Sequence, residues 1–576
     1  MYTEGDRDNP YSFDDYLQVR DAFDYYADDP FLQALVAHFC GDEAEHIDDQ
    51  LRRLSKKVSY AFRDLTNDAA TLENRIRCTQ VRHFDGFNHR IDAIERCAET
   101  EILERAVFDL GLFDPSRNSS WSRFAKMFLL YQNGEFGVMC PVACTDGMIA
   151  LARKFEGPEA GDDALGPEAR ALLSFARDGV LEPEGRRYAV GAQFLTEIQG
   201  GSDVNANLVE AVFEPEPGAD GQAGVWRLYG KKFFCSATQA DLALVTAKPK
   251  GTDSADRVGV FLVPAWLPEQ RERGVRNGCT IDRLKQKMGT AELPTAEITY
   301  DGAVAYPVGP LSKGLANVVA VTLTLSRLHV AFGMAAAGLR AAREATWYAQ
   351  FRSAFGYPVA QFPFVQNQIA ELNGFARRSA AGVFKMFGEY LALGETLPAG
   401  MRELSAIEDL QERKRRFRLR ELVLLQKITV AWEIPEKIRL AISLYGGHGI
   451  MEDFSALPRL LRDAFIMELW EGPRNVLLTQ IHRDVNKVKE WYPAADFCRD
   501  LLAGADDATV APLAREFERL MAHPSLVTPD PETLAICRDW DLFSVELCRA
   551  YQEQALAELG PDAPEVPDFQ TLRGRE

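Results

Sequence analysis

The hydrophobic period of this chain changes twice along its length, and this pattern constrains the fold more than any other feature. From about residue 11 to 155, apolar residues recur at spacings of three and four, which predicts helices. Between about 188 and 305, short β-branched and aromatic runs such as residues 258–263 are separated by turns, which predicts strands. Helical spacing returns at Gly314 and continues to about residue 486. We therefore expect a multi-domain α+β protein with a small antiparallel domain between two helical regions.

The length of 576 residues implies several packed units, because a single hydrophobic core stops growing at about 250–300 residues. We predict an N-terminal helical domain over residues 1–187 and a central β-barrel or sandwich over 188–305. We further predict a C-terminal four-helix bundle over 306–488, followed by an acidic helical extension and tail over 489–576.

The acidic balance limits the partners of the chain. The formal net charge is −20, and residues 497–576 hold 7 Lys and Arg against 16 Asp and Glu. Negative charge repels phosphate backbones and anionic lipid, so we expect neither nucleic acid nor membrane as a partner. The acidic residues 1–6 lack the basic and apolar parts of a secretory signal, and no apolar run approaches about 18 residues. A cytoplasmic protein is expected.

The cysteines and the common catalytic motifs narrow the chemistry further. The ten cysteines are scattered, which is typical of buried thiols in a reducing compartment. Cys140 and Cys144 are four residues apart, but no second Cys or His pair follows at zinc spacing, so we expect packed helix residues and no metal. The chain also lacks a His-Glu-x-x-His helix, a Walker loop, a Gly-x-Ser-x-Gly elbow and a Gly-x-Gly-x-x-Gly turn. A redox cofactor would therefore need a fold other than the Rossmann type.

Two glycine-containing clusters carry the candidate chemistry. Residues 195–203 read Leu-Thr-Glu-Ile-Gln-Gly-Gly-Ser-Asp, a turn whose backbone amides and hydroxyls can approach a ligand. Far downstream, residues 470–473 read Trp-Glu-Gly-Pro, shortly after a glycine-rich turn at 446–449. Each cluster alone is a turn with a carboxylate in it, and taken by itself the first is an ordinary loop.

Together and in this order, the clusters resemble the flavin-dependent acyl-CoA dehydrogenases over residues 85–486. The first cluster is similar to the family's Thr-Glu-Pro-x-x-Gly-Ser-Asp signature, with Ile198 in place of the proline. The chain resembles most the large AidB-like branch, with which it shares the Cys140-Pro141 segment, the Lys232-x-Phe234 spacing and a C-terminal helical extension. The resemblance implies FAD as the cofactor and an acyl-CoA as the substrate.

The resemblance also implies that two segments of the β domain contact the flavin. The Thr196 position meets the N5 and O4 edge of the ring, and the Ser202 position lies by the acyl-CoA. Phe234 takes the aromatic position that covers one flavin face, and Ser236 takes that of a hydroxyl that contacts the isoalloxazine. The cofactor residues expected from these segments are Leu195, Thr196, Gly201, Ser202, Phe234 and Ser236.

A second set of residues would serve the FAD of a neighbouring subunit. Arg352, in one Arg-x-x-Phe-Gly turn with Phe355, matches the position that reaches the pyrophosphate, a task for which a planar guanidinium is suited. Gly446 and Gly447 match the turn that receives the adenosine, and Pro473 is expected near the cofactor. A shared site requires a homo-oligomer, and we expect a tetramer ahead of a dimer. The dimer would be favoured if the acidic extension caps one interface.

Glu471 is the predicted catalytic base. In the family's reaction a carboxylate removes the α proton of the thioester and the β hydride passes to flavin N5, which gives a trans-2-enoyl-CoA. Burial suits a carboxylate to this role because it raises the pKa. The resemblance implies that the backbone N–H of the base and a flavin ribityl hydroxyl bind the thioester oxygen. Some members place the base near Ser326, where this chain has no carboxylate, which favours Glu471. The expected substrate contacts are Ser202, Arg327, Trp470, Glu471 and Gly472.

Two further motifs are interpreted as structural. Arg462 and Asp463 are expected to form an ion pair with each other. Residues 283–289 resemble the family's Lys-x-Gly turn, and we assign no catalytic role to them.

Three functions stay open at this point. The first is an FAD acyl-CoA dehydrogenase that passes electrons to an electron-transfer flavoprotein. The second is an acyl-CoA oxidase of the same fold, in which oxygen reoxidises the flavin. The third is an AidB-like flavin-loaded protein that binds nucleic acid or another protein, and the acidic extension counts against this function. The length of the acyl chain is encoded by no motif.

Overall fold

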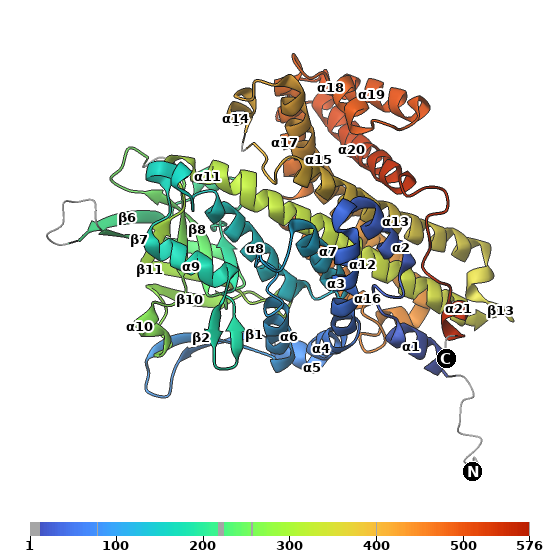
Figure 1. Ribbon diagram of the computed structural model, residues 1–576, viewed down its shortest axis with the longest axis horizontal. Coiled ribbons are helices and arrows are strands. Elements are labelled where there is room, and N and C mark those ends of the chain that lie inside the picture. The colour runs from blue at the N-terminus through green and yellow to red at the C-terminus, as the bar shows by residue number, and fades with distance from the viewer. Residues whose placement is uncertain (1–11, 78, 217–223, 255–256, 399, 575–576) are drawn as a thin grey trace, which may run out of the picture.

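The computed structural model describes residues 12–77, 79–216, 224–254, 257–398 and 400–574. The β domain lies at one end of the molecule, and the long helix α12 (Leu323–Phe351) extends from it towards the other end (Figure 1). The N-terminal helices pack beside α12, and the helices over residues 494–557 lie over the bundle at the top of this view. The predicted fold class is confirmed, because a small barrel stands between helical regions and the C-terminal part is helical.

Side chains cap the start of some of the N-terminal helices. The Asp29 side chain accepts from Leu32 N at 3.0 Å at the start of α2, and Ser119 accepts from Ser122 N at 3.0 Å at the start of α7. The helices of this region are α1 (Asp14–Ala22), α2 (Pro30–Phe39), α3 (Ala44–Lys56), α4 (Arg63–Ala69), α5 (Leu72–Arg77), α6 (Ala98–Phe108), α7 (Ser120–Gln132), α8 (Phe136–Arg153) and α9 (Pro167–Arg177).

A β-hairpin interrupts this stretch, so the expectation of helices throughout residues 11–155 is wrong there. It consists of β1 (Thr79–Phe84) and β2 (Arg90–Arg96), and every second residue of β1 is exposed. The buried Asp92 carboxylate accepts from Ile281 N at 2.9 Å and ties the hairpin to the β domain. The sequence of β1 does not alternate between apolar and polar residues, because Phe84 is exposed while Thr79 and His83 are partly buried, so its period gave no strand signal.

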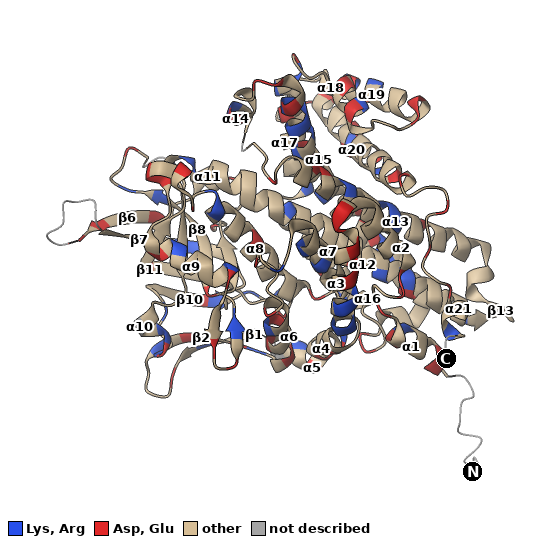
Figure 2. Cartoon of the chain, in the orientation of Figure 1, with Lys and Arg blue, Asp and Glu red and all other residues tan. Residues whose placement is uncertain are grey.

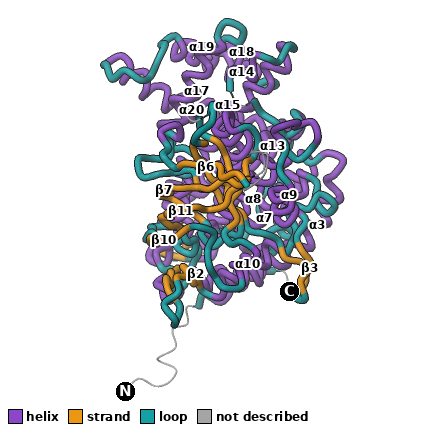
Figure 3. The backbone as a smooth tube through the Cα atoms, turned by 90° about the vertical axis from the view of Figure 1, so that its left-hand side faces the viewer, coloured by secondary structure: helices purple, strands orange, loops and turns teal. Residues whose placement is uncertain are grey.

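The β domain is a small barrel (Figure 3). Its strands follow the order β10-β11-β7-β6-β8-β5, and β9 pairs with both β11 and β8, which closes the ring. Most pairs are antiparallel as expected, but β8 runs parallel to β5 and to β6. The strands are β5 (Gly191–Phe194), β6 (Glu210–Pro215), β7 (Gly224–Ser236), β8 (Leu242–Pro249), β9 (Gly259–Pro264), β10 (Cys279–Leu284) and β11 (Thr295–Pro307). Short elements flank the barrel: β3 (Val180–Glu182), β4 (Gly185–Arg187), α10 (Pro268–Arg271) and α11 (Gly314–Asn317).

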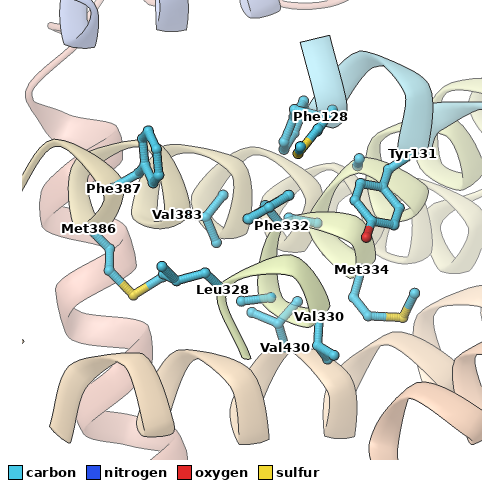
Figure 4. Close-up of a cluster of buried hydrophobic side chains, with 14 of the residues drawn as sticks. Phe128, Tyr131, Leu328, Val330, Phe332, Met334, Val383, Met386, Phe387 and Val430 are labelled. Carbon is cyan, nitrogen blue, oxygen red and sulfur yellow. The ribbon is translucent and has the colours of Figure 1, made fainter. Parts of the chain in front are cut away.

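The C-terminal bundle packs closely around α12. Its small residues let neighbours approach, and a Cβ on Gly338 would lie 2.9 Å from the ring of Phe375. Figure 4 shows Phe128, Phe332, Val383 and Val430 meeting in this core from four different helices. The bundle contains α13 (Pro363–Ala392), α14 (Met401–Ser405), α15 (Leu410–Tyr445), α16 (Leu457–Leu469), α17 (Arg474–Val488) and a two-residue hairpin of β12 (Ser353–Ala354) and β13 (Tyr357–Pro358).

Two stretches of helix are long and apolar enough to cross a membrane by length and composition alone. They are Phe136–Arg153 and Leu311–Phe351, and 83% of each apolar window is buried inside the molecule. Such burial is typical of core helices in a globular protein.

The C-terminal extension folds back over the bundle and returns to the far end of α12. It consists of α18 (Ala494–Leu501), α19 (Asp507–Met521), α20 (Pro531–Ala557) and α21 (Phe569–Arg573), and α20 packs along α13 and α15. Trp347 Nε1 on α12 donates to Pro567 O at 2.9 Å, and Arg377 pairs with Glu565 at 2.9 Å. Acidic and basic residues are interspersed on these helices, as Figure 2 shows.

Candidate active site

Glu471 lies on a strained turn at the end of α16. Its φ is +61°, in the left-handed region that a residue with a side chain adopts only where its surroundings hold it there. Gly472 follows with φ +104°, where a Cβ would lie 2.9 Å from Leu477. Glu471 itself is half-buried. Burial raises the pKa of its carboxyl group, while Arg327 and Lys427 oppose that rise. A carboxylate with a raised pKa is suited to accept a proton from carbon.

Two buried cations hold this turn by its carbonyl groups. Arg327 on α12 donates from Nε to Glu471 O at 3.0 Å. Lys427 on α15 donates from Nζ to Glu468 O at 2.8 Å and to Gly472 O at 2.7 Å. Sequence reasoning placed Arg327 here but missed Lys427. The signal that could have found it is a single lysine within residues 422–431, a stretch of helix that otherwise holds only uncharged and mostly apolar residues.

A buried ion pair between Lys232 and Glu197 fixes the loop over residues 195–203. Lys232 Nζ lies 2.8 Å from the Glu197 carboxylate, and both side chains are almost fully buried. Lys232 also donates to Leu195 O at 3.2 Å, so the carbonyl of Leu195 faces the protein interior. The same carboxylate accepts from Leu208 N and Val209 N at 2.6 and 3.1 Å. The sequence assigned no role to Glu197.

The two segments predicted at the flavin lie side by side. Phe233 N donates to Thr196 O at 2.9 Å, which joins the loop to β7. A Cβ on Gly201 would lie 2.6 Å from Thr196 Oγ1, so only glycine leaves this hydroxyl free. Ser202 is exposed, and Phe234 is 48% exposed beside the ammonium of Lys285.

The groups on this surface fit one face and edge of a flavin. Ser236 lies two positions after the half-exposed Phe234 on β7, and its Oγ lies 3.1 Å from Thr295 Oγ1 on the next strand. Polar groups that can bond the ring edge and an aromatic face that can cover it are the donor set that an isoalloxazine requires. The glycine at position 201 supplies the close approach.

The β domain and Glu471 belong to one site. Gln193 Nε2 on β5 donates to Ser326 Oγ at 3.5 Å, directly before Arg327. Trp470, directly before Glu471, packs against the hydrophobic core of the barrel. Pro473 caps the start of α17, immediately after the turn. The structure therefore brings the loop, β7 and Glu471 to the same junction between the barrel and the bundle.

Four predicted cofactor residues lie far from this junction in the same chain. Arg352 follows the last residue of α12, and 25 positions separate it from Arg327, which at 1.5 Å per residue is about 37 Å. Phe355 is 93% exposed beside it. The Gly446 and Gly447 turn joins this far end, because Tyr348 OH lies 3.1 Å from His448 Nδ1. One chain therefore presents two half-sites at opposite ends of α12.

The predicted ion pair between Arg462 and Asp463 is wrong. Arg462 pairs instead with Glu452 at 2.6 Å, and Asp463 Oδ1 accepts from Thr290 N at 2.6 Å. Asp463 is buried against the barrel, whereas Arg462 is only partly buried, so each side chain meets a different neighbour. A Cβ on Gly289 would lie 2.3 Å from Arg462 O, which explains the glycine in the Lys-x-Gly turn as a close contact between the barrel and α16.

Comparisons with known proteins agree with this geometry. Residues 192–303 match the family model of the acyl-CoA dehydrogenase middle domain, and residues 313–486 match that of the acyl-CoA dehydrogenase C-terminal domain. Acyl-CoA dehydrogenase family member 11 of Caenorhabditis elegans is 28% identical over 80% of this chain and 70% of its own. The putative acyl-CoA dehydrogenase AidB of Escherichia coli is 26% identical over 80% and 78%.

A solved structure shows the same fold. Caenorhabditis elegans ACDH-11 in complex with C11-CoA superposes with a TM-score of 0.69 at 23% identity, covering 95% of this chain and 92% of that one. Both family models together span the barrel and the bundle that form the junction around Glu471. The predicted family is confirmed, and the chain belongs to the FAD-dependent acyl-CoA dehydrogenases.

Proposed function

We propose that the protein oxidises an acyl-CoA thioester to the trans-2-enoyl-CoA, with Glu471 as the base. The observation that carries the proposal is the position of this carboxylate. It lies on a left-handed turn whose carbonyl groups are bound by two buried cations, at the junction where Gln193, shortly before the flavin-edge loop, reaches Ser326. When bound, FAD supplies the acceptor for the hydride that leaves the β carbon.

The residues of this chain account for the proton and the orientation. Burial raises the pKa of the Glu471 carboxyl group, which makes it a stronger base towards the α carbon, while Arg327 and Lys427 favour its charged form. The α proton passes to the carboxylate, and the electrons of that C–H bond form the new double bond as the β hydride departs. Trp470, packed against the barrel core, keeps one side of the turn apolar and dry.

Thr196, Phe234 and Ser236 would hold the isoalloxazine, whereas Arg352, Gly446 and Gly447 would hold the pyrophosphate and adenosine of a partner's FAD. The separation of about 37 Å along α12 supports this division, because one extended cofactor cannot use both ends of one chain in this way. We therefore propose a homo-oligomer, as a tetramer or alternatively as a dimer. The exposed Phe355 beside Arg352 would be covered by the second copy.

Replacement of Arg352 by glutamine is expected to weaken FAD retention by about 10- to 100-fold, because a charge-assisted contact to phosphate contributes about 1.5–3 kcal/mol. The measurement is the FAD content after gel filtration, with light scattering of the same fractions. Arg439→Gln is the matched control, since Arg439 is an exposed arginine that pairs with Glu436 on its own helix. Equal loss of FAD in both variants would contradict the assignment.

The physiological electron acceptor is proposed to be an electron-transfer flavoprotein, with oxygen as the alternative. Anaerobic bleaching of the flavin absorbance by a panel of acyl-CoAs, C11-CoA included, tests the reaction itself. Oxygen consumption with the best substrate then separates dehydrogenase from oxidase. No bleaching with any thioester would contradict the proposed function. The third function is tested by DNA retention at low salt, which we expect to be absent because the extension is acidic.

A further inference from the structure

Lys427 is an unusual residue for the centre of a bundle helix. It is 0% exposed within a run of buried residues on α15, and burial of an ammonium group is costly unless its donors are satisfied. Among the described residues, its bonds go to two backbone carbonyls and not to a carboxylate. A lysine that served only as packing could be replaced by an apolar side chain of similar length, which would avoid this cost.

The two carbonyls that Lys427 binds bracket Glu471. Glu468 O belongs to the last turn of α16, where carbonyl groups lack a partner within the helix. Gly472 O lies directly after Glu471. A cation at a helix C-terminus is favourable because the helix dipole is negative there. Lys427 therefore binds the C-terminal end of α16 and also the carbonyl that follows Glu471, so it holds the turn on both sides.

Arg327 completes the arrangement from the opposite helix. It binds Glu471 O at 3.0 Å, so the carbonyls of residues 468, 471 and 472 are all taken by buried cations from α12 and α15. A residue with a side chain rarely adopts a φ of +61°, and these bonds hold Glu471 in that conformation. With its carbonyl groups held on one side, the turn has little freedom to move its carboxylate.

The titratable groups around Glu471 come from three helices. Two are cations, Arg327 on α12 and Lys427 on α15. The third is Cys144 on α8, where a hydrogen bond with Cys140 and burial raise the pKa of the thiol, so it stays neutral. Burial lowers the pKa of Lys427 to about 7, with a further lowering by Arg327, while Glu471 and Glu468 favour its charged form. Burial lowers the pKa of Arg327 to about 10, so Arg327 remains charged at neutral pH. Lys427 is thus the cation near Glu471 that titrates close to neutrality.

We propose that Lys427 is a positioning residue for Glu471: its ammonium group fixes the left-handed turn and holds the carboxylate in its charged, proton-accepting form. The inference rests on the proposed function and deepens it, because it names a second residue on which the base depends. Two of the three hydrogen bonds that hold the turn then come from α15, a helix that carries none of the flavin-edge residues.

Three variants separate charge from packing. Lys427→Gln keeps a hydrogen-bond donor but loses the charge, Lys427→Met loses both, and Lys427→Arg keeps both. Lys437→Met is the matched control, because Lys437 lies ten positions along the same helix and pairs with Glu371 outside the site. FAD content and thermal unfolding are measured first for each variant, so that activity is compared only between loaded proteins.

The main measurement is the pH dependence of anaerobic flavin reduction in a single turnover. Without the cation, the carboxyl group holds its proton to higher pH, so the acidic limb should move up by about one pH unit in the Lys427→Gln and Lys427→Met variants. The rate on that limb then falls about 10-fold and recovers as pH rises, whereas Lys427→Arg and Lys437→Met follow the parental profile. If Lys427→Met does not load FAD, Lys427→Gln decides the result.

A second measurement needs no substrate. The infrared band of a protonated carboxyl group is followed against pH, and the part that disappears in Glu471→Gln is assigned to Glu471. This band should persist to higher pH in Lys427→Gln than in the parental protein. Identical titration in both proteins, or lost stability with an unmoved pH profile, would overturn the inference and leave Lys427 a structural residue. Failure of every acyl-CoA to bleach the parental flavin would instead count against the proposed function, because the infrared titration would still give its result.

Discussion

Replacement of Glu471 by glutamine is expected to lower the rate of flavin reduction by an acyl-CoA about 10²–10⁴-fold, while FAD and thioester binding stay nearly unchanged. Glutamine keeps the size of the side chain and its hydrogen bonds, but it cannot accept the α proton. The turn should survive the change, because Arg327 and Lys427 hold it through backbone carbonyls and not through the carboxylate. The measurement is anaerobic stopped-flow reduction of the FAD-loaded variant.

Glu490→Gln is the control for this experiment. Glu490 is exposed just after the end of α17, so its replacement removes a negative charge outside the junction without removing the proposed base. It should reduce at close to the parental rate. A loaded Glu471→Gln protein that reduces normally would move the base elsewhere. The acyl-CoA dehydrogenase reaction would then need another carboxylate in the same junction.

The sequence could predict those parts of the site in which a residue type determines the local backbone conformation. Gly201 and Gly472 occupy positions where a Cβ would meet Thr196 Oγ1 or Leu477, so their spacing within a motif reports a local shape. The change of hydrophobic period also predicted the order of helical and β regions, because each region buries one face of its elements. These inferences use neighbours within a few residues of one another.

The parts that sequence could not predict depend on contacts between distant segments. Lys427 reaches the Glu471 turn only because α15 packs beside α16. Glu197 looked like a polar loop residue, and its burial follows from Lys232 on β7, 35 positions later. The hairpin at residues 79–96 pairs with itself but is anchored through Asp92 to a strand far along the chain. None of these partners has a characteristic spacing.

The predicted pairing of Arg462 with Asp463 failed for a related reason. Adjacent residues of opposite charge do pair on other helices of this chain, as Arg20 and Asp21 do on α1. At Asp463 the partner comes from a distant segment instead, because the buried carboxylate accepts from Thr290 N beside the barrel. Adjacency along the sequence therefore does not by itself predict an ion pair.

Replacement of Glu197 by glutamine is expected to destabilise the barrel face of the flavin site by about 3–5 kcal/mol, because the Lys232 ammonium is left buried without its counter-ion. Lys232 is 1% exposed and cannot reach water without opening the strand that carries it. Lys231→Met is the matched control, since the adjacent Lys231 is exposed and pairs with Asp282 at 3.2 Å. The control should change stability by less than about 1 kcal/mol.

Local opening is the appropriate measure of this effect, because a chain with several domains does not unfold in a single two-state step. Hydrogen exchange of the Leu208, Val209 and Phe233 amides reports it directly: the first two donate to Glu197 and the third to Thr196 O. These amides should exchange about 10²–10⁴-fold faster in Glu197→Gln, and retention of FAD should fall with them. The double variant Glu197→Gln with Lys232→Met removes both charges and should recover part of the loss. A double variant as unstable as the sum of the two single ones would show that the pair is not coupled, and that the loop over residues 195–203 is held by its backbone bonds alone.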